Sequence, residues 1–176
     1  MTVTLALLIG GRGTRLGGVD KARIVRGSST LADTISGVFA PYVTRVITVG
    51  RAEQNPTVID SAPDEGPLRG IATALAYART PWVFVVATDS VGLVAGDLTG
   101  LLVERTRGRC AIGWAAPHGP EPLCALYSRA LLGTAERLLA GGERRAKALL
   151  KGEHLVPRPS AIANINTTAD LASMTG

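Results

Sequence analysis

A glycine-rich segment near the N-terminus has the residue types of a phosphate-binding loop. Six glycines from position 10 to position 27 follow a short apolar run, and Arg15 and Lys21 place two cations in the same segment. Glycine lets a backbone approach a ligand closely and direct its N–H groups at anionic oxygens. The two cations add charge-assisted contacts that suit a triphosphate whose bridging oxygen becomes a leaving group. The alternative is a flexible surface loop, but two cations at fixed spacing favour phosphate binding.

The spacing of this segment excludes the two commonest phosphate-binding loops. A P-loop requires G-x-x-x-x-G-K-[ST], and a match that begins at Gly13 places Val19 at the lysine position. A dinucleotide-binding loop requires G-x-G-x-x-G before a helix. A match that begins at Gly11 places Leu16 at the third glycine, and no helical stripe follows. The segment therefore predicts a phosphate cradle of another kind.

Further polar side chains follow apolar runs later in the chain. Asp89 comes just after the run Trp82–Ala87, so its carboxylate must face a cleft or be paired. Asp60 ends a shorter run, where an Asx turn that opens a loop is one explanation of its residue type. Asn164 and Asn166 are two positions apart, so in an extended strand both amides point to one side. Helix capping by Asn166 or Thr167 is the alternative there.

The composition restricts the class of protein. The 176 residues are 46% hydrophobic and 4% aromatic, which suits a single domain over residues 1–176 with an aliphatic core. The formal charge of +5 favours an anionic partner, but dispersed basic residues with few aromatic side chains argue against nucleic acid. The first apolar run is too short to span a bilayer and lacks the features of a secretion signal. We therefore expect a cytoplasmic protein without membrane contact that binds a small, phosphate-rich ligand.

Cysteine and histidine give no sign of a metal site. Cys110 and Cys124 form neither a disulfide framework nor a metal-ligand spacing, and the two histidines lie far apart. Zinc is therefore not expected. The two cysteines are predicted to be buried thiols in a reducing compartment.

Apolar runs of the strand type alternate with helical patterns along the chain. We predict strands at Leu5–Ile9, Arg45–Val49, Thr57–Asp60, Trp82–Ala87, Cys110–Trp114 and Leu123–Tyr127, and a short strand around Leu155. We predict helices at Leu31–Phe39, Leu68–Ala78, Asp97–Arg107, Ala130–Ala140 and Glu143–Leu150, and a last helix from Thr168. This alternation predicts an α/β fold with a mostly parallel central sheet and helices on both faces.

Ligands of such folds bind at the carboxyl ends of the strands. The stretches Gly10–Lys21 and Asp60–Gly70 and the residue Asp89 lie at predicted strand ends, and Asn164–Asn166 lies at or just after a late strand. These four parts of the chain are therefore the candidates for the functional site.

The stretch LLIGGRGTRLGGVDK, residues 7–21, resembles the motif L-A-G-G-x-G-x-R-M-G-G-x-D-K of the molybdenum cofactor guanylyltransferases (MobA-type). Further stretches resemble blocks of that family in the same order: DEGPLRGI at Asp64–Ile71, VVATDSVGL at residues 85–93, PLCALYSRALL at Pro122–Leu132, GERRAKALL at Gly142–Leu150 and NINTTADLA at Asn164–Ala172. The resemblance covers nearly the whole chain. It implies a three-layer, Rossmann-like nucleotidyltransferase fold with a mostly parallel central sheet.

The resemblance also implies roles for individual residues. The positions that correspond to nucleotide-binding residues are Leu8, Ile9, Gly10, Gly11, Gly13, Lys21, Asp60, Gly66 and Asp89. Asp89 corresponds to the residue that holds Mg²⁺, a hard ion that prefers carboxylates together with substrate phosphates. Arg15 and Lys21 correspond to cations on the phosphates and would act in catalysis with Asp89. Asn164 and Asn166 correspond to contacts with the metal or with the acceptor substrate.

Several positions depart from the family pattern. Ile9 stands where the family usually has alanine, and the asparagine that the family often has near Gly50 is missing. Ala87 and Val91 replace the two prolines that flank the family's aspartate. His118 lies in a segment where the family contacts the pterin, but the neighbouring arginine and second histidine of that segment are absent.

The reaction that the resemblance implies is attack by the terminal phosphate of molybdopterin on the α-phosphorus of GTP, with release of pyrophosphate. A phosphate monoester is largely dianionic at neutral pH, so this reaction needs no general base. The pair Gly10-Gly11 favours GTP over CTP. A cytidylyltransferase, a sugar-1-phosphate nucleotidyltransferase and a catalytically weak GTP-binding module remain alternatives, whereas a nicotinamide-dependent oxidoreductase is disfavoured. Transient contacts with other cofactor-biosynthesis proteins or molybdoenzymes are compatible with this role.

Overall fold

The computed structural model describes residues 2–10, 24–26, 29–60, 62, 65–105, 108–158 and 161–165. The helix predicted from Thr168 lies outside these residues.

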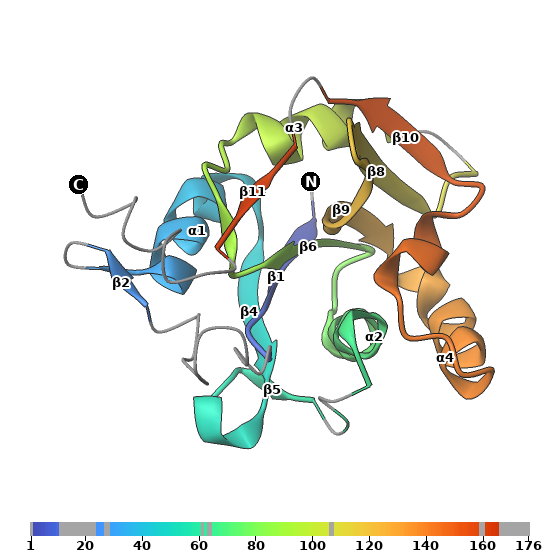
Figure 1. Ribbon diagram of the computed structural model, residues 1–176, viewed down its shortest axis with the longest axis horizontal. Coiled ribbons are helices and arrows are strands. Elements are labelled where there is room, and N and C mark those ends of the chain that lie inside the picture. Colours follow the sequence, from blue (N-terminus) through green and yellow to red (C-terminus); the bar gives the residue numbers. More distant parts are fainter. Residues whose placement is uncertain are drawn as a thin grey trace.

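A seven-stranded sheet forms the centre of the molecule (Figure 1). Its strand order is β10-β8-β9-β6-β1-β4-β5, with the bounds β1 Val3–Leu8, β4 Arg45–Gly50, β5 Val58–Ile59, β6 Trp82–Ala87, β8 Ala111–Ala116, β9 Gly119–Ser128 and β10 His154–Pro157. Strand β1 pairs in parallel with β4 and β6, and β5 and β10 are also parallel to their neighbours. Strand β9 runs antiparallel between β6 and β8. The predicted mostly parallel sheet is confirmed.

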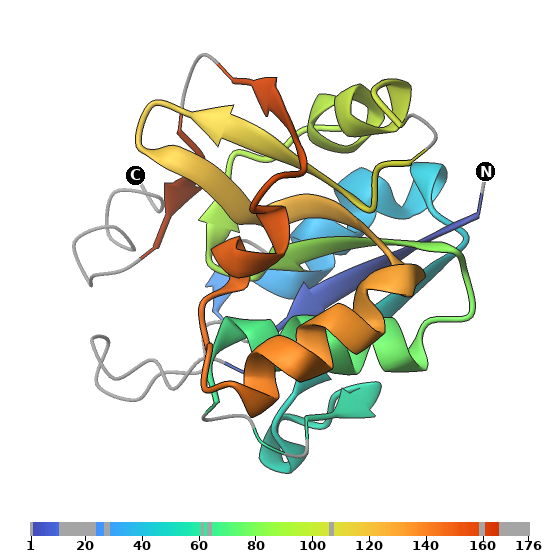
Figure 2. The ribbon, with the colours of Figure 1, turned by 90° about the vertical axis from the view of Figure 1, so that its right-hand side faces the viewer.

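Helices cover both faces of this sheet, as Figures 1 and 2 show. The helices α1 (Leu31–Phe39) and α3 (Gly96–Val103) pack on one face, and α2 (Pro67–Tyr77) and α4 (Leu132–Ala140) pack on the other. Short 3-10 helices connect the larger elements: η3 Ala40–Tyr42, η4 Ala52–Gln54, η5 Arg129–Leu131 and η6 Ala146–Leu150. The order helix, sheet, helix confirms the expected three-layer architecture.

Strand β1 is apolar except for Thr4, because both faces of the sheet are covered. Val3, Leu5 and Leu7 belong to the core cluster under α1 and α3, whereas Ala6 belongs to the cluster under α2 and α4. This division follows from strand geometry, in which successive side chains point to opposite faces. All four side chains are fully buried.

Helix α1 begins with a capping box between Thr30 and Asp33. The Thr30 hydroxyl accepts the N–H of Asp33 at 3.1 Å, and the Asp33 carboxylate accepts the N–H of Thr30 at 3.2 Å. This capping box satisfies N–H groups that the first turn of a helix leaves unbonded. Further along, Ile35 and Phe39 are one turn apart and face the sheet, where the Phe39 ring meets Phe84 edge-on at 5.1 Å between centroids.

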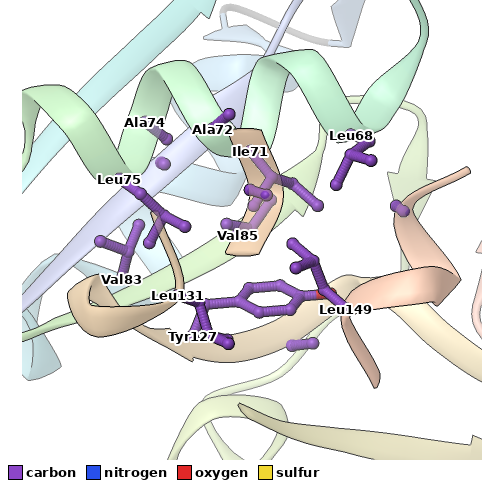
Figure 3. Packing of buried hydrophobic residues seen from close by; sticks show 14 of the residues in the cluster. Leu68, Ile71, Ala72, Ala74, Leu75, Val83, Val85, Tyr127, Leu131 and Leu149 are labelled. Carbon is purple, nitrogen blue, oxygen red and sulfur yellow. The ribbon is translucent and has the colours of Figure 1, made fainter. Parts of the chain in front are cut away.

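Helix α2 closes the core over β6 and β9 (Figure 3). Its side chains Ile71 and Leu75 lie in one cluster with Val85 of β6 and with the ring of Tyr127 from β9. Tyr127 is fully buried, and its hydroxyl donates to the backbone carbonyl of Pro122 at 2.8 Å. Burial raises the pKa of Tyr127 well above its usual value, so the phenol remains a hydrogen-bond donor at neutral pH.

The structure corrects the element predicted at Glu143–Leu150, which is not an α-helix. The chain turns at Gly142, with φ +86°, and forms η6 only from Ala146 to Leu150. The Glu143 carboxylate accepts the backbone N–H groups of Arg144 and Arg145 at 2.9 and 3.0 Å. Such side-chain to backbone bonds compete with helix formation.

Two other boundaries also differ from the prediction. Helix α3 ends at Val103 rather than at residue 107, and β9 begins at Gly119 rather than at Leu123. Gly119 has φ +115° and forms the tight turn between β8 and β9, a conformation that favours glycine. A hairpin of the six-residue β8 and the ten-residue β9 therefore replaces the two separate short strands that the sequence predicts.

Two small antiparallel sheets lie outside the central one, and the sequence pattern predicts neither. They pair β2 (Val25–Arg26) with β3 (Ser29–Thr30), and β7 (Ser90–Val91) with β11 (Ala163–Asn164). The second pair connects the segment after β6 to a late part of the chain.

Candidate active site

The carboxyl ends of β1 and β6 lie side by side and carry the first candidate residues. Leu8 pairs with Ala87 in parallel register, and the N–H of Thr88 then donates to the carbonyl of Leu8 at 3.3 Å. Asp89 follows in a turn and is half-buried, while Gly10 continues the chain beyond β1. The fold thus brings the metal candidate Asp89 to the edge of the sheet at which the glycine-rich segment begins.

Asn164 lies at the same edge, although it is far from Asp89 in the sequence. In the β7–β11 pair Asn164 is opposite Ser90, and the Ser90 hydroxyl donates to the Asn164 amide oxygen at 3.2 Å. The N–H of Ile165 donates to the carbonyl of Asp89 at 2.9 Å. The predicted site residues Asp89 and Asn164 are therefore held near each other by bonds through Ile165 and Ser90.

A pocket of about 190 Å³ opens where these segments meet. Its lining comes from the end of β6 with the following turn, from β9 and from the segment around β11: Ala87, Asp89, Ser90, Glu121, Pro122, Leu123, Ile162 and Asn164. A few polar groups among apolar walls are typical of a ligand site. The bond from the buried Tyr127 hydroxyl to the carbonyl of Pro122 holds one of these walls.

The residues Ile9 and Gly10 are held from the side of β4. The N–H of Ile9 donates to the carbonyl of Val49 at 2.9 Å, which extends the sheet ladder past the end of β1. The Gln54 side chain donates to the carbonyl of Ile9 at 2.7 Å, and the Arg51 guanidinium donates to the carbonyl of Gly10 at 3.4 Å. No motif or spacing in the sequence singles out Arg51 and Gln54.

Asp60 is buried at the end of β5, where its carboxylate has partners within the fold. Its oxygen accepts the N–H of Ala62 at 3.1 Å, which is the bond of an Asx turn, and the hydroxyl of Thr73 at 3.4 Å. The N–H of Asp60 donates to the carbonyl of Gly50 at 2.8 Å. The turn considered for Asp60 is thus present, and its contact with a nucleotide stays a prediction.

Gly66 begins helix α2 in a conformation that only glycine adopts readily. Its φ is +83° and its ψ is −179°, and a Cβ there would lie 3.0 Å from the carbonyl oxygen of Arg144. That carbonyl accepts the N–H of Leu68 at 3.2 Å. Gly66 therefore joins the start of α2 to the segment before η6, and this contact leaves no room for a side chain.

Charged side chains around Gly66 form a partly exposed network. Glu65 accepts from Arg69 one turn later in α2 and pairs with Arg144 at 3.4 Å. The hydrogen bond from Arg69 holds the pKa of Glu65 below its usual value. Arg144 is thus bound to the start of α2.

A buried ion pair ties the two segments around the pocket together. Arg158, after β10, donates from Nε and a terminal nitrogen to one Asp97 oxygen at 3.2 and 3.1 Å. The other Asp97 oxygen accepts the N–H of Val94 at 2.9 Å, and the Asp97 carbonyl accepts from the Trp114 indole at 3.0 Å. The side chains of Asp97 and Arg158 are 5% and 15% exposed, so the pair fixes the chain on both sides of the β7–β11 ribbon.

Several predicted site residues lie outside the described part of the chain: Gly11, Gly13, Arg15, Lys21 and Asn166. Their roles stay predictions. His118 is exposed in the turn between β8 and β9 and does not line the pocket described above. Cys124 is buried as predicted, but Cys110 is partly exposed.

Glu121 lines the pocket beside Pro122, although no sequence motif singles it out. Its position depends on a register shift between Gly113 and Trp114, after which Trp114 is opposite Glu121. The family-like stretch that begins at Pro122 was a signal one residue away. Ser90 was also missed, because a two-residue strand has no recognisable periodicity.

The layered sheet with a carboxylate at the carboxyl end of its central strand is the fold of Rossmann-like nucleotidyltransferases. The structure is similar to molybdopterin-guanine dinucleotide biosynthesis protein A from Archaeoglobus fulgidus, with a TM-score of 0.78 at 24% identity over 98% of this chain and 96% of that one. It is also similar to 2-C-methyl-D-erythritol 4-phosphate cytidylyltransferase from Thermus thermophilus, with a TM-score of 0.74 at 18% identity over 99% and 98% of the chains. These likenesses show the fold.

The sequence comparisons define the family more narrowly. The model of the MobA-like NTP transferase domain matches residues 5–158. A protein from Deinococcus radiodurans, named probable molybdenum cofactor guanylyltransferase, is 32% identical over 185 residues, which cover 100% of this chain and 95% of the relative. The chain therefore belongs to the MobA-like NTP transferase family, which confirms the resemblance read from the sequence. None of the helices within the described ranges is long and apolar enough to cross a membrane.

Proposed function

We propose that this protein transfers GMP from GTP to the terminal phosphate of molybdopterin, forming molybdopterin guanine dinucleotide and releasing pyrophosphate. The observation that carries the proposal is the pocket in which Asp89, Ser90 and Asn164 meet at the carboxyl ends of the strands. The membership in the MobA-like family and the 32% identity to a relative named for this activity support it.

The two substrates would approach this edge of the sheet from different sides. The nucleotide would lie at the end of β1, against Leu8, Ile9 and Gly10, with the glycines and cations of the following segment around its phosphates. Asp60, just after β5, and Gly66, just before α2, would complete the nucleotide side. The acceptor would lie toward β9 and β11, where Asn164 offers an amide and Pro122 an apolar wall.

The chemistry needs positioning and charge stabilisation more than proton transfer. The attacking phosphate monoester is already largely dianionic at neutral pH, so it requires no base to remove a proton. Holding the attacking oxygen in line with the α-phosphorus lowers the entropic barrier, and cations at the developing charge lower the electrostatic one. We assign the stabilisation of the negative charge on the leaving pyrophosphate to Arg15 and Lys21.

The donor atoms at the pocket fit a magnesium ion. The Asp89 carboxylate and the Asn164 amide oxygen are hard oxygen ligands, and Mg²⁺ is usually held by one or two carboxylates together with substrate phosphates. Asp89 would therefore hold Mg²⁺, with substrate oxygens and the Asn164 or Asn166 amide as further ligands. When bound, the ion would supply charge neutralisation at the triphosphate.

The remaining parts of the proposal concern the setting of this activity. We propose that residues 1–176 act as one nucleotidyltransferase domain in the cytoplasm. The product would be delivered in transient contacts to other cofactor-biosynthesis proteins or to molybdoenzymes.

The proposal is tested by incubating the protein with GTP, Mg²⁺ and molybdopterin and measuring the dinucleotide by mass spectrometry. Formation of the guanine dinucleotide with equimolar pyrophosphate is the expected result. Asp89→Ala should abolish product formation without loss of the fold, whereas the exposed residue Glu136 of α4 provides a control variant, Glu136→Ala, with unchanged turnover.

Competing nucleotides separate the alternatives. Product with CTP instead of GTP would show a cytidylyltransferase, and product with a sugar 1-phosphate instead of molybdopterin would show a different acceptor. Binding of GTP without pyrophosphate release with any acceptor would show a binding module. Turnover near wild type in the Asp89→Ala variant would overturn the assignment of Asp89.

A further inference from the structure

The short turn after β4 holds the backbone from which the glycine-rich segment starts. Helix η4 (Ala52–Gln54) is preceded by Arg51 and followed by Asn55, whose φ of +51° reverses the chain. The Gln54 amide uses both of its ends: its oxygen accepts the N–H of Arg51 at 3.0 Å, and its nitrogen donates to the carbonyl of Ile9 at 2.7 Å. One side chain therefore closes η4 and binds β1 to it.

The bond from Gln54 determines the direction of a backbone donor. The described peptide bonds are all trans, and in a trans peptide the N–H points opposite to the C=O. Because the carbonyl of Ile9 points at Gln54, the N–H of Gly10 in the same peptide points to the other side, away from η4. The donation of Arg51 to the carbonyl of Gly10 at 3.4 Å orients the next carbonyl in the same way.

The turn is closely packed against the end of β4. A Cβ on Gly50 would lie 2.4 Å from Cγ1 of Ile9 and 2.7 Å from the amide oxygen of Gln54. Ile9, where the family usually has alanine, thus occupies the space that a side chain at Gly50 would need. Its own side chain is buried, so Ile9 and Gly50 are fitted to each other and Gln54 lies directly against both.

We infer that Gln54 is a positioning residue for the nucleotide: it orients the Ile9–Gly10 peptide, and with it the N–H of Gly10, toward the site. This inference rests on the proposed function in one respect, that the nucleotide lies against Ile9 and Gly10. Oriented backbone N–H groups bind anionic oxygens and ligand acceptors without reorganisation at the moment of binding. Loss of this orientation should therefore weaken binding of the nucleotide and leave binding of the acceptor unaffected.

Three variants test this role by steady-state kinetics with GTP and molybdopterin. Gln54→Met keeps the length of the side chain but removes both hydrogen bonds. Gln54→Glu keeps an acceptor for Arg51 but loses the donor to Ile9. Gly50→Ala introduces a Cβ that clashes with both Ile9 and Gln54. Each should raise the KM for GTP about tenfold, the effect of one lost oriented hydrogen bond, with the KM for molybdopterin within about twofold.

A matched control distinguishes the effect of losing the peptide orientation from the effects of an added charge and of a destabilised fold. Ala52→Glu places the same negative charge as Gln54→Glu on an exposed position of the same turn, and it should leave the KM for GTP within about twofold of wild type. The melting temperature and both KM values are recorded for every variant. Equal rises in both KM values with a lowered melting temperature, or an unchanged KM for GTP in folded Gln54→Met, would overturn the inference.

Measurements on the wild type distinguish a failure of the proposed function from a failure of the role of Gln54. If the wild type forms no guanine dinucleotide but uses another nucleoside triphosphate, the proposed function fails. The role of Gln54 is then decided by comparing the KM for that nucleotide with the KM for the acceptor in wild type and variants. If the wild type is active with GTP and the Gln54 variants match it, the role of Gln54 fails alone. If the wild type binds no nucleoside triphosphate, both proposals are wrong.

Discussion

Ser90 donates its hydroxyl proton to the amide oxygen of Asn164 at 3.2 Å, across 74 positions of sequence. The two residues face each other in the β7–β11 ribbon, directly beside Asp89. This bond fixes which end of the Asn164 amide faces Ser90. The Asn164 side chain is thereby oriented at the pocket before any substrate arrives.

The first prediction concerns the acceptor. Asn164→Asp keeps the oxygen that accepts from Ser90 but places a second charge beside Asp89, where a phosphate should bind. The KM for molybdopterin should rise about tenfold or more, because a like charge near the phosphate opposes its binding, while the KM for GTP changes less. Ser90→Ala, which removes only the orienting hydroxyl, should give a smaller rise. Equal effects of Asn164→Asp on both substrates would place Asn164 on the shared metal instead.

The second prediction concerns the start of α2. Gly66→Ala should lower the free energy of unfolding by about 1–3 kcal/mol, since the φ and ψ of Gly66 belong to a region that essentially only glycine adopts, and since the Arg144 carbonyl lies 3.0 Å from the new Cβ. Urea denaturation measures the change. Gly37→Ala is the matched control, because Gly37 lies exposed inside α1 with no atom within 4 Å of its Cβ position. That variant should gain about 0.5–1 kcal/mol.

Local signals explain which elements the sequence predicts well. Helix α1 and strand β6 have the predicted bounds, because a capping box and a continuous valine-rich run are readable within a few residues. The segment at Glu143–Leu150 has helical composition, but the Glu143 carboxylate binds the next two N–H groups and the chain leaves the helix. Composition does not reveal this competition.

Long-range pairing explains the residues of the site that were missed. The motif around Asp89 and the amide at Asn164 are visible in the sequence, but their meeting depends on two-residue strands that pair only in the folded chain. The position of Glu121 at the pocket depends on the register shift at Gly113. A register shift produces no periodic pattern in the sequence from which it could be predicted. The role of Gln54 likewise becomes visible only once β4 lies beside β1.

The third prediction concerns the ion pair of Asp97 and Arg158. Arg158→Met leaves the Asp97 carboxylate buried without its cation, so the free energy of unfolding should fall by about 3–5 kcal/mol. The double variant Asp97→Asn with Arg158→Met removes both charges and keeps an oxygen for the Val94 N–H, so it should recover part of that loss. Urea denaturation of both single variants and of the double variant gives the interaction free energy between Asp97 and Arg158. A double variant less stable than Arg158→Met would show that the pair does not act as a unit.

The fourth prediction concerns the two thiols. Cys124 is buried in the sheet, and burial, followed by the nearby Asp97 carboxylate, raises the pKa of its thiol far above the usual value. Since the thiolate is the reactive species, Cys124 should resist alkylation in the folded protein at pH 8. Cys110 is partly exposed at the start of β8, so iodoacetamide should modify one thiol rapidly and the second only after unfolding. Peptide mapping by mass spectrometry identifies the modified residue, and Cys110→Ser is the control that should abolish the rapid phase. Rapid labelling of Cys124 in that variant would show that the core beneath the pocket opens far more readily than its packing indicates.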